Sequence, residues 1–106
     1  MLKIYGSEQC HDCIACKHNF DKYGIAYHFI DINKNIHDLA AFLALRDHNP
    51  IFAHCKEIGD IGLPALVRED GSIFLNWENF LEEQGYVVVT PPTAFSEACS
   101  LDHKGC

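Results

Sequence analysis

Residues 2–24, LKIYGSEQCHDCIACKHNFDKYG, decide the fold. Residues 2–5 predict a short strand that ends at Gly6, because the segment is mostly apolar or aromatic. A helix is expected to begin near Cys10, since apolar positions from there recur three and four residues apart. Gly24 ends this helix as a C-terminal cap. The stretch therefore predicts a strand that leads directly into a helix.

The rest of the chain alternates strands and helices. We expect strands at residues 25–32, 64–67 and 72–75, and helices at residues 36–46, from Pro50 onward and at residues 77–84. Asp70 and Gly71 form a pair that favours a tight hairpin turn. A strand, a crossover helix and a second strand require a parallel pair, and the hairpin adds antiparallel strands. The predicted fold is therefore α/β, with a mixed four-stranded sheet flanked by helices.

The composition describes a single acidic domain. The chain has 106 residues, and 8 Lys and Arg against 15 Asp and Glu give a formal net charge of −7. Such a chain lacks the basic stripe that neutralises phosphates, so we expect no nucleic-acid partner. Its apolar opening is interrupted by Lys3, unlike a secretory signal, and no apolar run approaches the roughly 18 residues of a membrane span. We therefore expect a cytoplasmic protein with no membrane partner.

Six cysteines are the main functional lead. In a reducing compartment, clustered cysteines indicate redox or metal chemistry rather than structural disulfides. Cys10 and Cys13 form a C-x-x-C motif at the strand-to-helix junction, where both sulfurs can meet across the first helical turn. Unpaired amides and the helix dipole favour a thiolate at Cys10; protonated His11 adds to this effect, and Asp12 opposes it. Cys13, inside the helix, can resolve a mixed disulfide formed at Cys10.

Leu63-Pro64 enters the third predicted strand directly, where a proline is unusual and a cis bond would be a deliberate feature. Over roughly residues 1–84 the chain resembles the glutaredoxin branch of the thioredoxin superfamily. The resemblance rests on Ile4-Tyr5, Cys10-His11-Asp12-Cys13, Gly24 and Gly62-Leu63-Pro64. It implies a thioredoxin/glutaredoxin-like fold, with Cys10 as the attacking thiol, Cys13 as the resolving thiol and Pro64 as a cis-proline facing Cys10. The backbone of Leu63 would then pair with an extended substrate or with glutathione.

The resemblance also implies where a substrate would bind. The groove is expected between residues 7–13, residues 63–64 and the turn at residues 75–78. Trp77 either flanks this cleft or packs the last helix. The expected substrate-binding residues are His11, Leu63, Pro64 and Trp77.

Three departures from the family concern glutathione. His11-Asp12 replaces the common Pro-Tyr pair, Ser7 stands where glutaredoxins often carry a lysine, and residues 73–78 contain no Gly-Gly-Asp segment. Since the residues that bind glutathione are largely missing, we expect no cofactor. The electron donor is then either glutathione or thioredoxin reductase.

The residues leave three functions open. The leading hypothesis is a thiol–disulfide oxidoreductase that reduces protein or small-molecule disulfides through its dithiol. The second is a metal or iron–sulfur protein that uses Cys10, Cys13 and Cys16 with a ligand from the tail or from a second chain. The third is a non-catalytic binding module that keeps the fold.

The other cysteines divide between the core and the tail. Cys16 lies on the apolar stripe of the first helix, and Cys55 lies on the inner face of the short helix that begins at Pro50. Both are therefore expected in the core. Cys99 and Cys106 belong to the end of the chain, which we expect to be weakly ordered.

The chain is expected to divide near residue 85. Residues 1–84 form the glutaredoxin-like domain, and residues 85–106 form a C-terminal extension. Within this extension, residues 86–89 are rich in valine and are a candidate extra edge strand.

Overall fold

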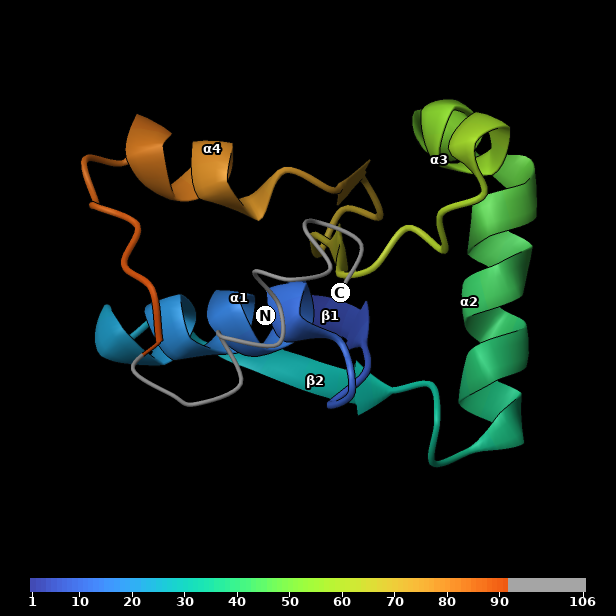
Figure 1. Ribbon diagram of the computed structural model, residues 1–106, viewed down its shortest axis with the longest axis horizontal. Coiled ribbons are helices and arrows are strands. Elements are labelled where there is room, and N and C mark those ends of the chain that lie inside the picture. Colours follow the sequence, from blue (N-terminus) through green and yellow to red (C-terminus); the bar gives the residue numbers. More distant parts are fainter. Residues whose placement is uncertain (92–106) are drawn as a thin grey trace.

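The computed structural model describes residues 1–91 of the chain (Figure 1). The helices and strands expected before residue 85 are all present, with slightly different ends. In chain order they are β1 (Leu2–Gly6), α1 (His11–Lys22), β2 (Tyr27–Asp31), α2 (Ile36–His48), the 3-10 turn η1 (Pro50–Phe52), α3 (Ala53–Ile58), β3 (Ala65–Val67), β4 (Ile73–Phe74) and α4 (Trp77–Glu83).

The sheet is mixed and four-stranded, as predicted, with the order β2-β1-β3-β4. β1 pairs in parallel with β2 and antiparallel with β3, and β3 pairs antiparallel with β4. Ile4 lies at the centre of this arrangement, opposite Phe29 on one side and Leu66 on the other. The protein thus has an α/β fold in which β1 is an inner strand of the sheet, between β2 and β3.

Helices cover both faces of the sheet. Since side chains alternate along a strand, Ile4 and Leu66 point to one face, and the neighbouring Tyr5 and Ala65 point to the other. The first face packs against α1 and α4 in a core that includes Phe20. The second face packs against α2 and η1. Figure 1 shows α1 running beside β2, with α2 standing across that direction.

The two cysteines expected in the core behave differently. Cys16 is fully buried against the first face of the sheet, which confirms its packing role. Cys55 is only half-buried, so its expected place in the core is wrong. The reason is that Phe52, in the turn before α3, fills the second core instead, and α3 itself contributes no buried residue.

Residues 86–89 contact the end of α1 and do not form the edge strand expected there. The buried Asn19 of α1 donates its amide to the carbonyl oxygen of Val89 at 2.9 Å and accepts the N–H of Val89 at 2.8 Å. Tyr23 donates its hydroxyl to the carbonyl oxygen of Val87, and its ring stacks on Tyr86. A helix side chain thus satisfies backbone groups that a neighbouring strand would otherwise pair.

Replacing Asn19 with alanine is expected to destabilise the protein by about 1–3 kcal/mol, since the half-buried N–H and C=O of Val89 would lose their partners. Asn49→Ala is the matched control. Both asparagines donate a hydrogen bond to the carbonyl oxygen four residues earlier, at 2.8 Å. Of the two, only Asn19 also forms hydrogen bonds with Val89. Urea unfolding of both variants measures the difference. Equal losses of stability would show that the contacts to Val89 contribute nothing.

No helix within residues 1–91 is long and apolar enough to cross a membrane. Cys99, Cys106 and the tail expected to be weakly ordered lie outside the described residues.

Candidate functional site

The turn between β1 and α1 places Cys10 at the N-cap of the helix. The N–H of Cys10 donates to the carbonyl oxygen of Ser7 at 3.1 Å, and the Ser7 hydroxyl accepts the N–H of Gln9 at 3.1 Å. Cys10 keeps an extended backbone, and its Sγ accepts the N–H of Cys13 at 3.3 Å. The sulfur therefore occupies the position where a helix N-terminus has unpaired donors.

These contacts favour a thiolate at Cys10. A hydrogen bond from the Cys13 thiol, together with the backbone N–H groups of Cys13 and Asp12, lowers the pKa of Cys10 to about 7. Partial burial and the charge of Asp12 act in the opposite direction. A large fraction of this thiol is therefore ionised at neutral pH, and the thiolate is the nucleophilic form.

Cys13 is the protonated partner of this pair. Its side chain is fully buried, and its pKa is raised well above the usual range because its thiol donates to Cys10 and lies away from water. The close fit depends on Gly6, where a Cβ would come within 2.9 Å of the Cys13 Sγ and 2.9 Å of the Phe29 ring. Both cysteines are free thiols, so this is the reduced state of the pair.

Cys13→Ala is expected to raise the pKa of Cys10, because the Cys13 thiol provides the largest lowering effect. Cys13→Ser keeps a hydroxyl donor and should shift it less. The measurement is the rate of Cys10 alkylation by iodoacetamide against pH, followed by mass spectrometry of the Cys10 peptide. The midpoint should lie near the pKa of about 7 in the starting protein. A midpoint in Cys13→Ala equal to that of the starting protein would show that the Cys13 thiol has no such effect.

Trp77 reaches the site through one hydrogen bond. Its side chain is 2% exposed and packs in the core, and its Nε1–H donates to Asp12 Oδ1 at 3.3 Å. Loss of hydration raises the pKa of Asp12, the bond from Trp77 lowers it, and the charge of Asp60 raises it. Trp77 therefore packs α4 and also positions the carboxylate that lies between the two cysteines in the sequence.

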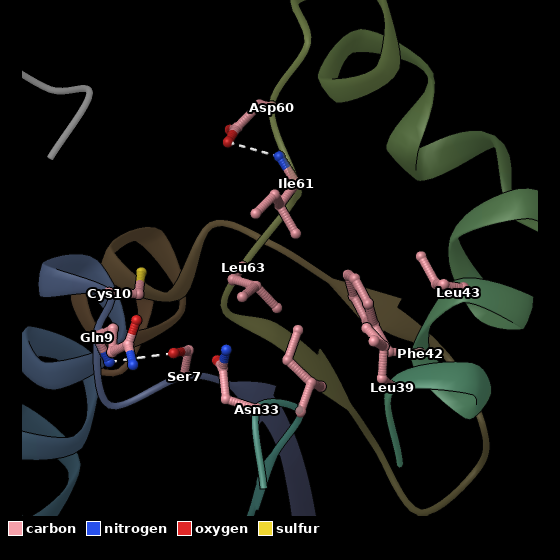
Figure 2. A pocket seen from close by; sticks show the side chains of 11 residues that line it. Ser7, Gln9, Cys10, Asn33, Leu39, Phe42, Leu43, Asp60, Ile61 and Leu63 are labelled. Carbon is pink, nitrogen blue, oxygen red and sulfur yellow. Dashed lines mark hydrogen bonds between the residues drawn. The ribbon is translucent and has the colours of Figure 1, made fainter. Parts of the chain in front are cut away.

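A pocket of about 600 Å³ opens beside Cys10 (Figure 2). Figure 2 shows Cys10 at one side, α2 at the other, and Ile61 and Leu63 between them. The lining residues are Ser7, Gln9, Cys10, Ile32, Asn33, Leu39, Phe42, Leu43, Asp60, Ile61 and Leu63. The candidate nucleophile thus faces a largely apolar cavity.

The expected binding residues are only partly assembled around this pocket. Leu63 lines it, and the Leu63–Pro64 peptide bond is cis, as predicted, with Pro64 buried. His11 and Trp77 do not line it, nor does any residue of the turn at 75–78, which was the third expected wall. The wall opposite Cys10 comes instead from α2.

Sequence reasoning missed the residues that form this opposite wall. Leu39, Phe42 and Leu43 share one face of α2, and only Phe42 is fully buried. Asp60 and Ile61 come from the loop after α3. The available signal was the apolar face of α2, but the sequence did not show that this face extends beyond the core toward Cys10.

Within residues 1–91, no group of three or more His, Cys, Asp and Glu side chains is arranged to hold a metal ion. Burial raises the pKa of Cys16 well above its usual range, which keeps that thiol protonated. The alternative that adds a ligand from the tail to Cys10, Cys13 and Cys16 involves residues outside this part of the chain.

Comparison with known proteins finds a similarity that covers about two thirds of the chain. No protein-family model matches the chain. A Haemophilus influenzae protein that is described as an uncharacterized protein is 29% identical over 73 residues, which cover 69% of this chain and 85% of that protein. The name of this relative assigns no activity.

Proposed function

We propose that the protein is a glutaredoxin-like thiol–disulfide oxidoreductase that reduces disulfides in protein or small-molecule substrates through Cys10 and Cys13. The observation that carries the proposal is a half-buried thiol at the N-cap of α1, which opens onto a pocket and has a second, buried thiol one turn behind it. The sheet order and the cis bond before Pro64 support a thioredoxin/glutaredoxin-like fold. The proposed location is the cytoplasm, where thiol reductants return a redox dithiol to its reduced form.

The reaction begins with attack by the Cys10 thiolate on one sulfur of a substrate disulfide. A bond forms between Cys10 and that sulfur, the substrate disulfide breaks, and the departing thiolate takes a proton from solvent. The negative charge on Cys10 is thereby lost. Since that charge and its hydrogen bond hold the pKa of Cys13 high, Cys13 can now release its proton more easily.

The Cys13 thiolate then attacks Cys10 and completes the reduction. The Cys10–Cys13 disulfide forms, the mixed disulfide breaks, and the second substrate sulfur leaves as a thiolate that is protonated by solvent. In total, the substrate gains two electrons and two protons, and the protein is oxidised to its disulfide. A thiol reductant, either glutathione or a thioredoxin reductase, returns the two electrons.

Titration with oxidised and reduced glutathione tests this proposal. The expected product is one reversible disulfide that joins Cys10 to Cys13, located by mass spectrometry of peptides after quenching with acid. Cys55→Ser should titrate like the starting protein, because Cys55 takes no part. A protein that stays folded and forms no Cys10–Cys13 disulfide at any glutathione ratio would contradict the proposal.

Comparing the two reducing systems then identifies the donor. The oxidised protein is mixed with glutathione and glutathione reductase, or with thioredoxin reductase, and NADPH consumption is followed. Because the pocket beside Cys10 is lined by Asp60 and by no lysine or arginine, we expect the protein donor to be faster. Faster reduction by glutathione would reverse this assignment of the donor while leaving the dithiol chemistry intact.

A further inference from the structure

The pocket beside Cys10 contains a carboxylate, and no lysine, arginine or histidine lines the pocket with it. Besides the Cys10 thiol, Asp60 is the one ionisable side chain among those that line it. One carboxylate oxygen of Asp60 accepts the N–H of Ile61 at 2.8 Å. Arg46 lies beside this loop, and its two hydrogen bonds to it go to the backbone carbonyl oxygens of Asp60 and Ile61, at 2.7 and 2.9 Å. Within residues 1–91, no salt bridge includes the Asp60 carboxylate.

A second carboxylate, that of Asp12, lies close to Asp60. Asp12 lies close enough to Asp60 for the negative charge of Asp60 to raise the pKa of Asp12. Lys17 and Lys34 each lie 3.7 Å from Glu8, and neither of them lines the pocket. A ligand with carboxylates would therefore meet repulsion beside Cys10, and a ligand with a cation would meet attraction.

The other walls of the pocket are apolar and accessible. Leu43 is 41% exposed and Ile61 is 56% exposed, although both belong to the lining of the cavity. Phe42 belongs to the core behind them, and Leu63 packs against that core. An apolar side chain placed here would cover the exposed surface of Leu43 and Ile61, which favours its binding.

We propose that this pocket selects a protein segment whose reactive cysteine is flanked by an apolar residue and by a lysine or arginine. The apolar side chain lies against Leu43 and Ile61, and the cation pairs with Asp60. This inference rests on the proposed function and specifies its substrate class. It makes a basic protein disulfide the preferred substrate and glutathione disulfide, with its carboxylates, a poor one.

The charge preference is tested with two short peptide disulfides, homodimers of acetyl-Leu-Cys-Lys-amide and acetyl-Leu-Cys-Glu-amide. The ratio of their kcat/KM values is measured within each variant, so that changes in Cys10 reactivity cancel. We expect the lysine peptide to be preferred by about fivefold to tenfold at low salt, which is the scale of one exposed ion pair replaced by a repulsion. The preference should shrink in 1 M salt.

Asp60→Lys is expected to remove or invert this ratio. Glu69→Lys is the matched control, because Glu69 is also exposed but lies in the hairpin turn after β3, at the opposite end of that strand from Pro64. Its ratio should match that of the starting protein. An unchanged ratio in Asp60→Lys, or an equal change in both variants, would overturn the role of Asp60.

The apolar preference is tested in the same way with acetyl-Ser-Cys-Lys-amide. Leu43→Gln should lower the advantage of the leucine peptide over the serine peptide severalfold. Ile36→Gln, which changes an exposed residue of the same helix outside the pocket, should leave it unchanged. If the leucine peptide has the same advantage over the serine peptide in the starting protein, in Leu43→Gln and in Ile36→Gln, the apolar part of the inference is wrong.

Two outcomes separate this inference from the proposed function. If glutathione disulfide is reduced as fast as the lysine peptide, the substrate class is wrong and the oxidoreductase activity stands. If the folded protein reduces no disulfide of any kind, the proposed function fails, and the inference fails with it.

Discussion

Cys10→Ser is expected to lower disulfide reductase activity by about three orders of magnitude or more, which is the scale of losing a nucleophile. A serine hydroxyl at this N-cap position accepts the N–H of residue 13 much as the sulfur does, so the fold should be kept. It does not ionise near neutral pH and cannot form a disulfide. Turnover of a peptide disulfide, followed by release of its thiol, measures the effect.

Cys55→Ser is the control for this experiment. It also removes one thiol, yet Cys55 lies on α3, outside the lining of the pocket, and burial raises its pKa. Its activity should match that of the starting protein. Substantial turnover in folded Cys10→Ser would mean that another cysteine is the nucleophile, and the proposed mechanism would then be wrong.

Trp77→Ala is expected to cost about 3–5 kcal/mol of stability, since it removes a large buried side chain and leaves a cavity. Trp77 is 2% exposed and packs in the same core as Cys16, Phe20 and Leu81. A domain of this size has roughly 5–15 kcal/mol in total. The variant should therefore unfold at a much lower urea concentration, as measured by circular dichroism.

Trp77→Phe separates packing from positioning. It keeps most of the buried volume and removes the N–H that donates to Asp12. Because that hydrogen bond lowers the pKa of Asp12, the pKa should rise further in this variant. Carbon NMR of the Asp12 carboxyl group against pH measures the shift. An unchanged Asp12 pKa would show that the indole acts in packing alone.

The central strand–helix unit could be predicted from the sequence because its signals are local. The C-x-x-C motif follows a short strand directly, and the helical spacing places Cys13 and Cys16 on the buried side of α1. The position of Cys10 at the start of α1 is therefore set by residues close to it in the sequence. The cis bond before Pro64 was implied by the resemblance to glutaredoxins that Gly62-Leu63-Pro64 carries.

The contacts made over long sequence separations could not be predicted in this way. Residues 86–89 have the valines of a strand, but they contact the end of α1 because Asn19, on the buried stripe of that helix, needs partners and finds them at Val89. The one signal was a polar residue at a buried helical position, which has to be hydrogen-bonded. No comparable pattern in the sequence indicated that Asp60, in the loop after α3, would line the same pocket as Cys10.

The most direct test of the mechanism uses Cys13→Ser, in which the resolving step is blocked. Incubation with a peptide disulfide followed by non-reducing mass spectrometry should show one peptide attached through Cys10, removable by dithiothreitol. The double variant Cys10→Ser/Cys13→Ser should show none. The mechanism predicts that this adduct accumulates; a folded Cys13→Ser protein that traps no peptide, while the starting protein reduces the same disulfide, would contradict it.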